Sequence, residues 1–376
     1  MLFETPELDA QDQRALERIA ALRQDLRWRV AEPRRWFGSL RRLSMARVIQ
    51  GSNSIEGYNA DLDDVVAEAE GEEVLDPRSE TRLALRGYRE AMTMVLQVAG
   101  DPHFEYNEML LRSLQFMMTS YDLKKRPGQW RSGSIFVRNV ETGDVVYEGP
   151  DVDLVPGLMA ELVDWLRQGD ERPALAHAAM AHLNLVMIHP FRDGNGRMAR
   201  CLQSLVLARE GILAPPFASI EEYLGRNTQA YYDVLAEVGA GRWQPERDAR
   251  PWVRFCLWAH YRQARTLLQR VKEAEQLWGL LEDLASECGL PERVVGGLYD
   301  AALGLRVRNA TYRSSHEDLS ENLASRDLRA MVDAGLLIPY GERRGRHYVG
   351  APRVREVYAS IRKQRSSMPE DDPFAP

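Results

Sequence analysis

The chain has few of the residues and segments that mark secreted, metal-binding or membrane proteins. Its three cysteines, Cys201, Cys256 and Cys288, are odd in number, far apart and without metal-ligand spacing. Free thiols in a reducing compartment are therefore expected. The N-terminus lacks the basic and apolar parts of a leader peptide, and no apolar run approaches the length of a membrane span. These absences predict a cytoplasmic protein that makes no membrane contact.

Lysine is also scarce, and acidic residues outnumber basic ones. The net charge is −7, and only four of the 49 basic residues are lysine. This balance argues against broad adhesion to nucleic acid or membranes, although local patches stay open. We attribute the low lysine content to genome composition rather than to function. With 376 residues and an apolar fraction of 44%, the chain can form two or three soluble domains.

One short segment is costly to place between two apolar helices unless it has a function. Residues 189–200 read His-Pro-Phe-Arg-Asp-Gly-Asn-Gly-Arg-Met-Ala-Arg. A helical pattern over 183–188 leads into this segment, and another over 198–207 leads out of it. Gly194 and Gly196 allow the backbone to approach a ligand closely. The first N–H groups of the helix that follows have no partner within the helix and favour an anion. The segment therefore predicts an anion cradle.

The side chains of this segment suit a substrate that carries phosphate. Arg197 and Arg200 share one helix face and can bind phosphate oxygens. Asp193 is a hard oxygen ligand suited to Mg²⁺. His189 has an ordinary pKa near neutrality and is the natural general base. Because no side chain here is an obvious nucleophile, we expect attack by an incoming hydroxyl. An ordinary turn between helices would explain Asp-Gly-Asn-Gly alone, but not the whole segment.

At this point the sequence resembles a known family. Residues 189–200 match the Fic-domain signature His-Pro-Phe-x-Asp/Glu-Gly-Asn-Gly-Arg-x-x-Arg at every fixed position. The resemblance implies transfer of AMP from ATP, with Mg²⁺ as cofactor, to a Ser, Thr or Tyr hydroxyl of a target protein or of the chain itself. It implies that His189 takes the hydroxyl proton and that Asp193 holds the metal. The phosphate-binding residues it implies are Gly194, Asn195, Gly196, Arg197 and Arg200.

A second segment gains meaning from the same resemblance. Alone, residues 51–57 indicate a helix C-terminus closed by a glycine. Ser52, Glu56 and Gly57 also match the family's inhibitory pattern, Ser/Thr-x-x-x-Glu-Gly/Asn, placed N-terminal to the core. A Glu56 carboxylate facing Arg200 would occupy the guanidinium that otherwise holds the terminal phosphate, so ATP would bind in an unproductive pose. The spacing leaves open whether Glu56 reaches Arg200.

Residues 127–151 interrupt the helical pattern. Two β-prone runs, 134–137 and 144–148, flank Glu141-Thr142-Gly143-Asp144 and predict a hairpin. A surface hairpin without a role is one interpretation. The resemblance implies instead the family's flap, which holds a target peptide as an added strand. The docking residues would be Ile135, Phe136, Val137, Val145 and Val146.

The helical pattern 221–238 carries aromatic residues at helical spacing, which is typical of a core. We interpret Tyr231 in this way. The family places residues of this helix beside the adenine, so the resemblance implies that Asn227 and Tyr232 contact the nucleotide. His177 and His182 lack zinc-ligand spacing and are interpreted as ordinary helix histidines.

The pattern changes after a long helix predicted over 252–274. Short helices are expected over 277–288, 291–302 and 320–334, followed by two strands around 341–346, which suggests a winged-helix-like domain. DNA binding through residues 320–349 is one interpretation. Protein contact or dimerisation is the other, because acidic residues dilute the positive charge. The residues that would contact DNA are Ser325, Arg326, Arg329, Arg343, Arg344 and Arg346.

The predicted fold class is mainly α, with a Fic helical core, a β-hairpin flap and a C-terminal winged-helix-like domain. The predicted divisions are an N-terminal helical region with the inhibitory motif (1–100), the catalytic core (101–262), the winged-helix-like domain (263–364) and a disordered tail (365–376). The implied activity is that of a protein adenylyltransferase inhibited by Glu56. Removal of AMP from a modified protein, transfer of another phosphate-containing group, and DNA binding with a nucleotide-sensing core are the alternatives.

Overall fold

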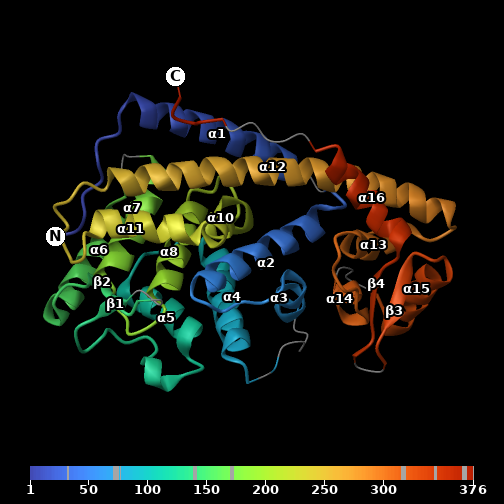
Figure 1. Cartoon of the computed structure of the whole chain (residues 1–376), viewed down its shortest axis with the longest axis horizontal. Coiled ribbons are helices and arrows are strands. Elements are labelled where there is room, and N and C mark those ends of the chain that lie inside the picture. Colours follow the sequence, from blue (N-terminus) through green and yellow to red (C-terminus); the bar gives the residue numbers. More distant parts are fainter. Residues whose placement is uncertain are drawn as a thin grey trace.

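The computed structural model describes residues 1–376 except 32–33, 71–75, 77, 139–141, 170–172, 315–318, 343–344, 366–370 and 376. Helices dominate the described residues, and the strands form two antiparallel pairs (Figure 1). The predicted mainly α fold class is confirmed. Among the helices of these residues, none combines the length and the apolar character that crossing a membrane requires.

The N-terminal half builds the site around two central helices. Its elements are α1 (Ala10–Ala31), α2 (Phe37–Ile55), α3 (Leu62–Ala69), α4 (Glu80–Val98), α5 (Glu108–Thr119), η1 (Leu123–Lys125), β1 (Phe136–Arg138), β2 (Val145–Glu148), η2 (Val152–Leu154), α6 (Val155–Gln168), α7 (Ala174–Ile188) and α8 (Asn195–Arg209). Nearly every side chain of α7 and α8 is buried, as expected for helices packed on all sides. Helices α2, α4 and α5 pack against α8, and α6 and α12 (Arg250–Glu287) pack against α7.

The prediction of one continuous helix over 221–238 is wrong. The chain forms α9 (Pro215–Ala218), then α10 (Glu221–Arg226) and α11 (Thr228–Gly239), with a break at Asn227. Asn227 has φ −126° and ψ 40°, outside the helical region. Its side-chain amide donates to the carbonyl oxygen of Tyr223 at 2.8 Å. Asparagine favours such local bonds over a continuous helix, which explains the break.

The prediction of two separate helices over 252–274 and 277–288 is also wrong. They form one helix, α12, of 38 residues, about 57 Å long at 1.5 Å per residue. No glycine or proline separates the two patterns, and the buried stripe continues through Leu277, Leu281 and Leu284. Helix α12 runs along the molecule with α1 beside it (Figure 1). The predicted domain boundary at 262/263 therefore falls inside this helix.

The C-terminal region forms a small helical group with one hairpin. Its elements are η3 (Glu292–Val294), α13 (Val295–Ala302), α14 (Asn309–Ser314), α15 (Glu321–Asp333), β3 (Leu337–Tyr340), β4 (His347–Gly350) and α16 (Pro352–Lys363). The predicted strand pair is confirmed, with Leu337 opposite Gly350 and Tyr340 opposite His347. Ser325, Arg326, Arg329 and Arg346 are exposed, and Arg343 and Arg344 lie outside the described residues. The winged-helix-like and DNA-binding assignments stay predictions.

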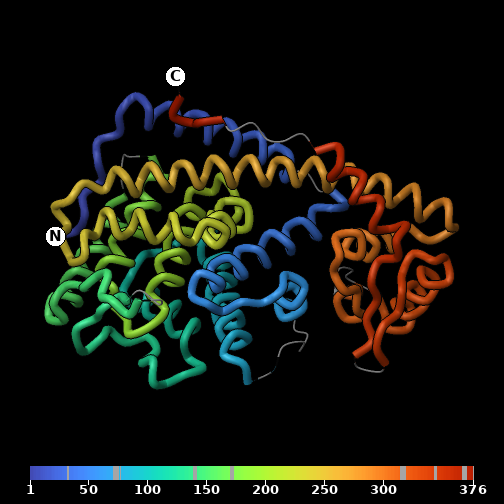
Figure 2. The backbone as a smooth tube through the Cα atoms, in the orientation of Figure 1, coloured from blue at the N-terminus to red at the C-terminus, as the bar shows by residue number. Residues whose placement is uncertain are grey.

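Residues 371–375, which belong to the predicted disordered tail, contact α1 and α12. The Tyr261 hydroxyl donates to a carboxylate oxygen of Asp371 at 2.6 Å, and Arg18 donates to the backbone carbonyl of Asp372 at 2.6 Å. Phe374 lies under the guanidinium of Arg254, 5.9 Å from it. These polar and aromatic partners come from α1 and α12, against which the end of the chain lies (Figure 2). Residues 366–370 and 376 of the predicted tail lie outside the described residues.

Candidate active site

His189 lies directly after α7 in a left-handed conformation, with φ 50°. Its Nδ1 is 3.0 Å from the carbonyl oxygen of Val186. Because a carbonyl oxygen only accepts hydrogen bonds, Nδ1 carries the proton and Nε2 keeps its lone pair. Burial lowers the pKa of His189 below its usual value of 6.5. His189 is therefore a neutral imidazole at pH 7, as a general base requires.

The loop after His189 is held by its own side chains and by the flap. Asn195 both accepts from the backbone N–H of Phe191 and donates to its carbonyl oxygen, each at 2.9 Å. Arg131, between α5 and β1, donates to the carbonyl oxygens of His189, Gly133 and Pro150. The Asn195 side chain thus fixes the loop. Arg131 was not predicted from the sequence, and it joins both ends of the flap to His189.

The N-terminus of α8 faces the carboxylate of Glu56. Gly194, with φ 82°, precedes the helix, and Gly196 lies in its first turn. A Cβ atom on Gly196 would lie 2.3 Å from Oε1 of Glu56 and 3.1 Å from Nη1 of Arg200. Any side chain at this position would collide with the carboxylate. Glu56 therefore occupies the place where the backbone and dipole of α8 favour an anion.

Arg200 is bound by the segment that ends α2. Its Nη2 donates to Oε1 of Glu56 at 2.7 Å and to the backbone oxygen of Ser52 at 2.8 Å, and its Nε donates to the Ser52 hydroxyl at 2.9 Å. The Arg200 side chain is 1% exposed. Burial alone would lower the pKa of this guanidinium, but Glu56, Tyr231 and Tyr88 together raise it overall. Ser52 and Glu56, predicted as one motif, therefore meet the same guanidinium.

Two nitrogen atoms in the cradle have no hydrogen-bond partner among the described residues. They are Nη1 of Arg200 and Nε of Arg197, both buried. Buried donors of this kind are rare and call for an explanation. An anion bound at the N-terminus of α8 would supply the missing acceptors.

Behind Arg200 lies a neutral polar network that supports it. The guanidinium lies 5.9 Å from the ring centre of Tyr231, whose hydroxyl lies 3.0 Å from Nε2 of His182. Nδ1 of His182 lies 2.7 Å from the amide oxygen of Gln203, which accepts its proton. Burial lowers the pKa of His182 to about 3. Tyr231 is buried, as its core interpretation required, and His182 is a structural histidine rather than a metal ligand.

Asp193 meets Lys125, which was not singled out from the sequence. Its Oδ2 lies 2.9 Å from Nζ of Lys125, and its Oδ1 accepts the backbone N–H of Gly194 at 2.8 Å. Burial would raise the pKa of Asp193, but Lys125, Arg197 and this N–H lower it overall. Lys125 lies 68 positions before Asp193 in the chain, so local spacing gave no sign of the pair.

Asp193 suits a metal ion whose other ligands are mainly substrate phosphates and water. The carboxylate is ionised, and 36% of the Asp193 side chain is exposed. No group of three or more His, Cys, Asp or Glu side chains able to hold a metal occurs among the described residues. Mg²⁺ in phosphate-transfer sites is bound by one or two carboxylates, substrate phosphates and water. One carboxylate beside an anion cradle meets that requirement.

Tyr58 and Tyr232 lie close to the inhibitory segment, whereas Asn227 lies elsewhere. The Tyr58 ring lies 5.1 Å from the guanidinium of Arg197, and the Tyr232 hydroxyl donates to the carbonyl oxygen of Ile55 at 3.0 Å. Tyr232 therefore lies beside Glu56. Asn227 instead lines a cavity toward the C-terminal region. The nucleotide contacts expected of Tyr232 and Asn227 stay predictions.

The predicted hairpin is confirmed for the described residues. Strand β1 pairs antiparallel with β2, with Phe136 opposite Glu148 and an irregularity after Val137. Phe136, Val145 and Val146 are exposed, whereas Ile135 and Val137 are partly buried. The Tyr147 hydroxyl donates to the carbonyl oxygen of Met187 at 2.8 Å, which anchors the hairpin on α7. Glu141 of the predicted turn lies outside the described residues, and target docking stays a prediction.

Comparisons with known sequences agree with this geometry. Residues 106–207 match the model of the Fic/DOC family. The chain is 38% identical over 132 residues to "Protein adenylyltransferase Fic" of Nematostella vectensis, a match that covers 34% of this chain and 26% of the relative. It is 39% identical over 118 residues to the protein of the same name from Culex quinquefasciatus, covering 29% and 21%. The chain therefore spans about a quarter of the length of these relatives.

Solved structures share the fold. A Fic family protein from Desulfovibrio desulfuricans G20 superposes with a TM-score of 0.56 at 22% identity, covering 93% of this chain and 98% of that chain. Fic-1 from C. elegans gives a TM-score of 0.55 at 22% identity, covering 69% and 73%. At this identity the likeness establishes the fold alone. The family match itself covers residues 106–207 and identifies this part of the chain as a Fic/DOC domain.

Proposed function

We propose that this chain is a protein adenylyltransferase, which moves AMP from ATP to a Ser, Thr or Tyr hydroxyl of a protein. One observation carries the proposal. His189, whose Nε2 keeps its lone pair, lies in the same loop as the anion cradle of α8. In that cradle, Nε of Arg197 and Nη1 of Arg200 have no hydrogen-bond partner among the described residues. The sequence relatives from Nematostella vectensis and Culex quinquefasciatus, both named as protein adenylyltransferases, support this activity.

In the proposed reaction, Nε2 of His189 takes the proton of the acceptor hydroxyl. The oxygen attacks the α-phosphorus of ATP, and the bond between that phosphorus and the oxygen bridging to the β-phosphorus breaks. Pyrophosphate leaves, and AMP stays on the acceptor. Arg197, Arg200 and the N-terminus of α8 neutralise the charge that develops on the departing oxygens. Asp193 would hold Mg²⁺, which supplies further positive charge to the phosphates when bound.

We infer that the end of α2 inhibits this reaction. The carboxylate of Glu56 lies over the N-terminus of α8 and binds Arg200 at 2.7 Å. A terminal phosphate would need the same guanidinium and the same space. ATP would therefore bind with its phosphates displaced from the line of attack. Tyr58 adds a second contact, because its ring lies against Arg197 and its hydroxyl accepts from Lys125 at 3.2 Å.

The flap is the proposed site for the acceptor segment. Arg131 ties both ends of the hairpin to the backbone of His189. An added strand on this hairpin would be held by main-chain hydrogen bonds, which fix register and leave the acceptor sequence loosely specified. The exposed Phe136, Val145 and Val146 would supply apolar contacts.

Two labels on ATP test the proposed reaction. With Mg²⁺ and the Glu56→Gly variant, label at the α-phosphate is expected to stay on protein, and label at the γ-phosphate is expected in pyrophosphate. Transfer of γ-label would mean phosphoryl transfer and contradict the proposal. Loss of AMP from a pre-modified protein without any forward transfer would favour the reverse reaction instead.

The pH dependence of transfer is a further prediction. Because the pKa of His189 lies below 6.5, the imidazole is already in its basic form above that pH. For the Glu56→Gly variant, kcat/KM is therefore expected to change by less than about twofold from pH 6.5 to 8. It should fall as pH drops below 6.5 and His189 becomes protonated. Activity that rises steadily from pH 7 to 8.5 would contradict this assignment, because the base would then have a higher pKa.

A further inference from the structure

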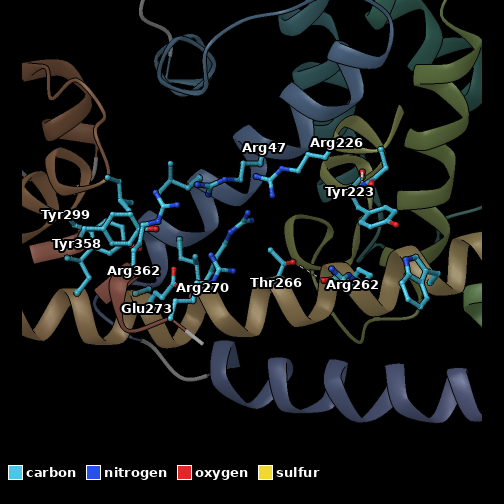
Figure 3. Close-up of a pocket in the computed structure, with 18 of the residues that line it drawn as sticks. Arg47, Tyr223, Arg226, Arg262, Thr266, Arg270, Glu273, Tyr299, Tyr358 and Arg362 are labelled. Atoms are coloured by element: carbon cyan, nitrogen blue, oxygen red, sulfur yellow. Dashed lines mark hydrogen bonds and ion pairs between the residues drawn. The ribbon is translucent and has the colours of Figure 1, made fainter. Parts of the chain in front are cut away.

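A cavity with a volume of about 950 Å³ lies between the Fic core and the C-terminal region. Helices α2, α10, α12, α13 and α16 contribute its lining (Figure 3). Ligand-binding cavities in proteins commonly have volumes of about 300–1,000 Å³. None of its lining residues belongs to the loop 189–200 or to the inhibitory motif.

The cavity is strongly basic, although the whole chain is acidic. Six arginines and two carboxylate residues, Glu273 and Asp372, line the cavity. The whole chain, by contrast, carries a net charge of −7. A concave, positively charged site of this kind attracts anions. The arginines that line it are Arg47, Arg226, Arg262, Arg270, Arg362 and Arg365.

One carboxylate beside the cavity is shared by three of these arginines. Arg270 binds both oxygens of Glu222, each at 2.6 Å, and Arg226 binds one of them at 2.7 Å. The ion pair of Arg47 with the same carboxylate spans 3.8 Å. Three guanidinium groups around one carboxylate leave an excess of two positive charges. A bound anion would balance this excess.

Arg47 carries the least compensated of these charges. It projects from the middle of α2 into the cavity (Figure 3). Burial, followed by repulsion from Arg270, lowers its pKa to about 10 against the attraction of Glu222. The protein therefore holds a partly buried cation beside others of the same sign. Phosphate is an anion whose oxygens several guanidinium groups can bind together.

The cavity also contains aromatic side chains. Tyr299 of α13 and Tyr358 of α16 lie together beside Arg362, and Tyr223 of α10 lies near Arg226 at the other end (Figure 3). Aromatic rings stack favourably on the faces of nucleic bases. The two tyrosines therefore suit a planar ring joined to the phosphates.

We propose that this cavity binds a nucleoside polyphosphate, with its phosphates on Arg47, Arg226 and Arg270 and its base against Tyr299 and Tyr358. The site is separate from the cradle of α8. It takes its residues from both the Fic core and the C-terminal region, so a bound ligand would join these parts. It is independent of the proposed transfer reaction.

Calorimetric titration of the full chain at low ionic strength tests the site. Two probes are used: inorganic tripolyphosphate and an ATP analogue with a methylene group between the α- and β-phosphorus. Both are titrated into the Arg200→Ala variant, in which the cradle of α8 lacks its main guanidinium. One bound probe per chain is expected, with the ATP analogue bound at least tenfold more tightly than tripolyphosphate.

Variants added to Arg200→Ala locate the binding. Arg47→Gln and Arg226→Gln are each expected to weaken both probes at least tenfold. Tyr358→Leu should weaken the ATP analogue and leave tripolyphosphate unchanged. Arg86→Gln is the matched control, because it removes one exposed positive charge from α4 outside the cavity and should change neither affinity. Thermal melting reports whether each variant remains folded.

Three results would overturn the proposal. The first is loss of all binding in Arg200→Ala, which would assign the probes to the cradle of α8. The second is an unchanged affinity in the folded Arg226→Gln variant, whose exposed side chain can be replaced without disturbing the core. The third is equal affinity for the two probes, which would exclude a nucleoside-binding role for the tyrosines.

Discussion

Replacing Glu56 with glycine is expected to raise the rate of AMP transfer at least tenfold. The substitution removes the carboxylate that binds Arg200 at 2.7 Å and lies over the N-terminus of α8. The guanidinium then becomes available to the terminal phosphate of ATP, and the space for that phosphate is vacated. A tenfold effect corresponds to about 1.4 kcal/mol, a modest part of what a buried charge pair can contribute. Initial rates with α-labelled ATP measure it.

A matched pair of substitutions separates this effect from a general change of charge. Glu56→Gln and Glu90→Gln each remove one negative charge, but Glu90 lies on the exposed face of α4 and pairs with Arg86. Only Glu56→Gln is expected to raise the rate. Equal rates in the wild type and in Glu56→Gly, with ATP bound by both, would refute the inhibitory assignment.

Replacing Arg200 with alanine is expected to lower transfer by the Glu56→Gly variant about 100- to 1,000-fold. Removing one preorganised donor to a developing charge typically costs this much. The effect should also be non-additive. Without Arg200, removing Glu56 frees no phosphate-binding group, so the Arg200→Ala single variant and the Glu56→Gly/Arg200→Ala double variant should transfer AMP at similar slow rates.

The conservative variant distinguishes the catalytic effect from a loss of folding. Arg200 is buried, and its removal also breaks hydrogen bonds to Ser52. Arg200→Lys keeps the charge but loses the two-pronged geometry of the guanidinium. It should recover part of the activity, whereas Arg200→Ala should not, at matched thermal stability. Activity of the double variant close to that of Glu56→Gly alone would contradict a phosphate-binding role for Arg200.

The local parts of the fold could be predicted from the sequence. The helical pattern over 183–188 ends where α7 ends, because the apolar run meets a proline-containing loop. The two glycines, the arginine spacing and the helical pattern over 198–207 together predicted the cradle, and α8 begins directly after Gly194. The hairpin followed from β-prone runs around a turn. Each of these signals lies within about a dozen residues.

The sequence could not predict contacts between distant segments. Lys125 reaches Asp193, and Arg131 reaches His189, across more than 50 residues without any local pattern. The cavity near Arg47 arises only when α2, α12 and α16 meet. The order of residues 371–375 depends in the same way on α1 and α12. Periodicity also missed the break at Asn227, because a side-chain hydrogen bond decided it.

The most direct test of the account compares α-label incorporation from Mg-ATP in three proteins: wild type, Glu56→Gly, and Glu56→Gly with His189→Ala. Strong label in Glu56→Gly, weak label in the wild type and a loss of at least 100-fold on removing His189 are predicted, because the neutral imidazole accepts the hydroxyl proton. Label that persists without His189, or no label in any of the three while ATP still binds, would contradict adenylyl transfer by this site.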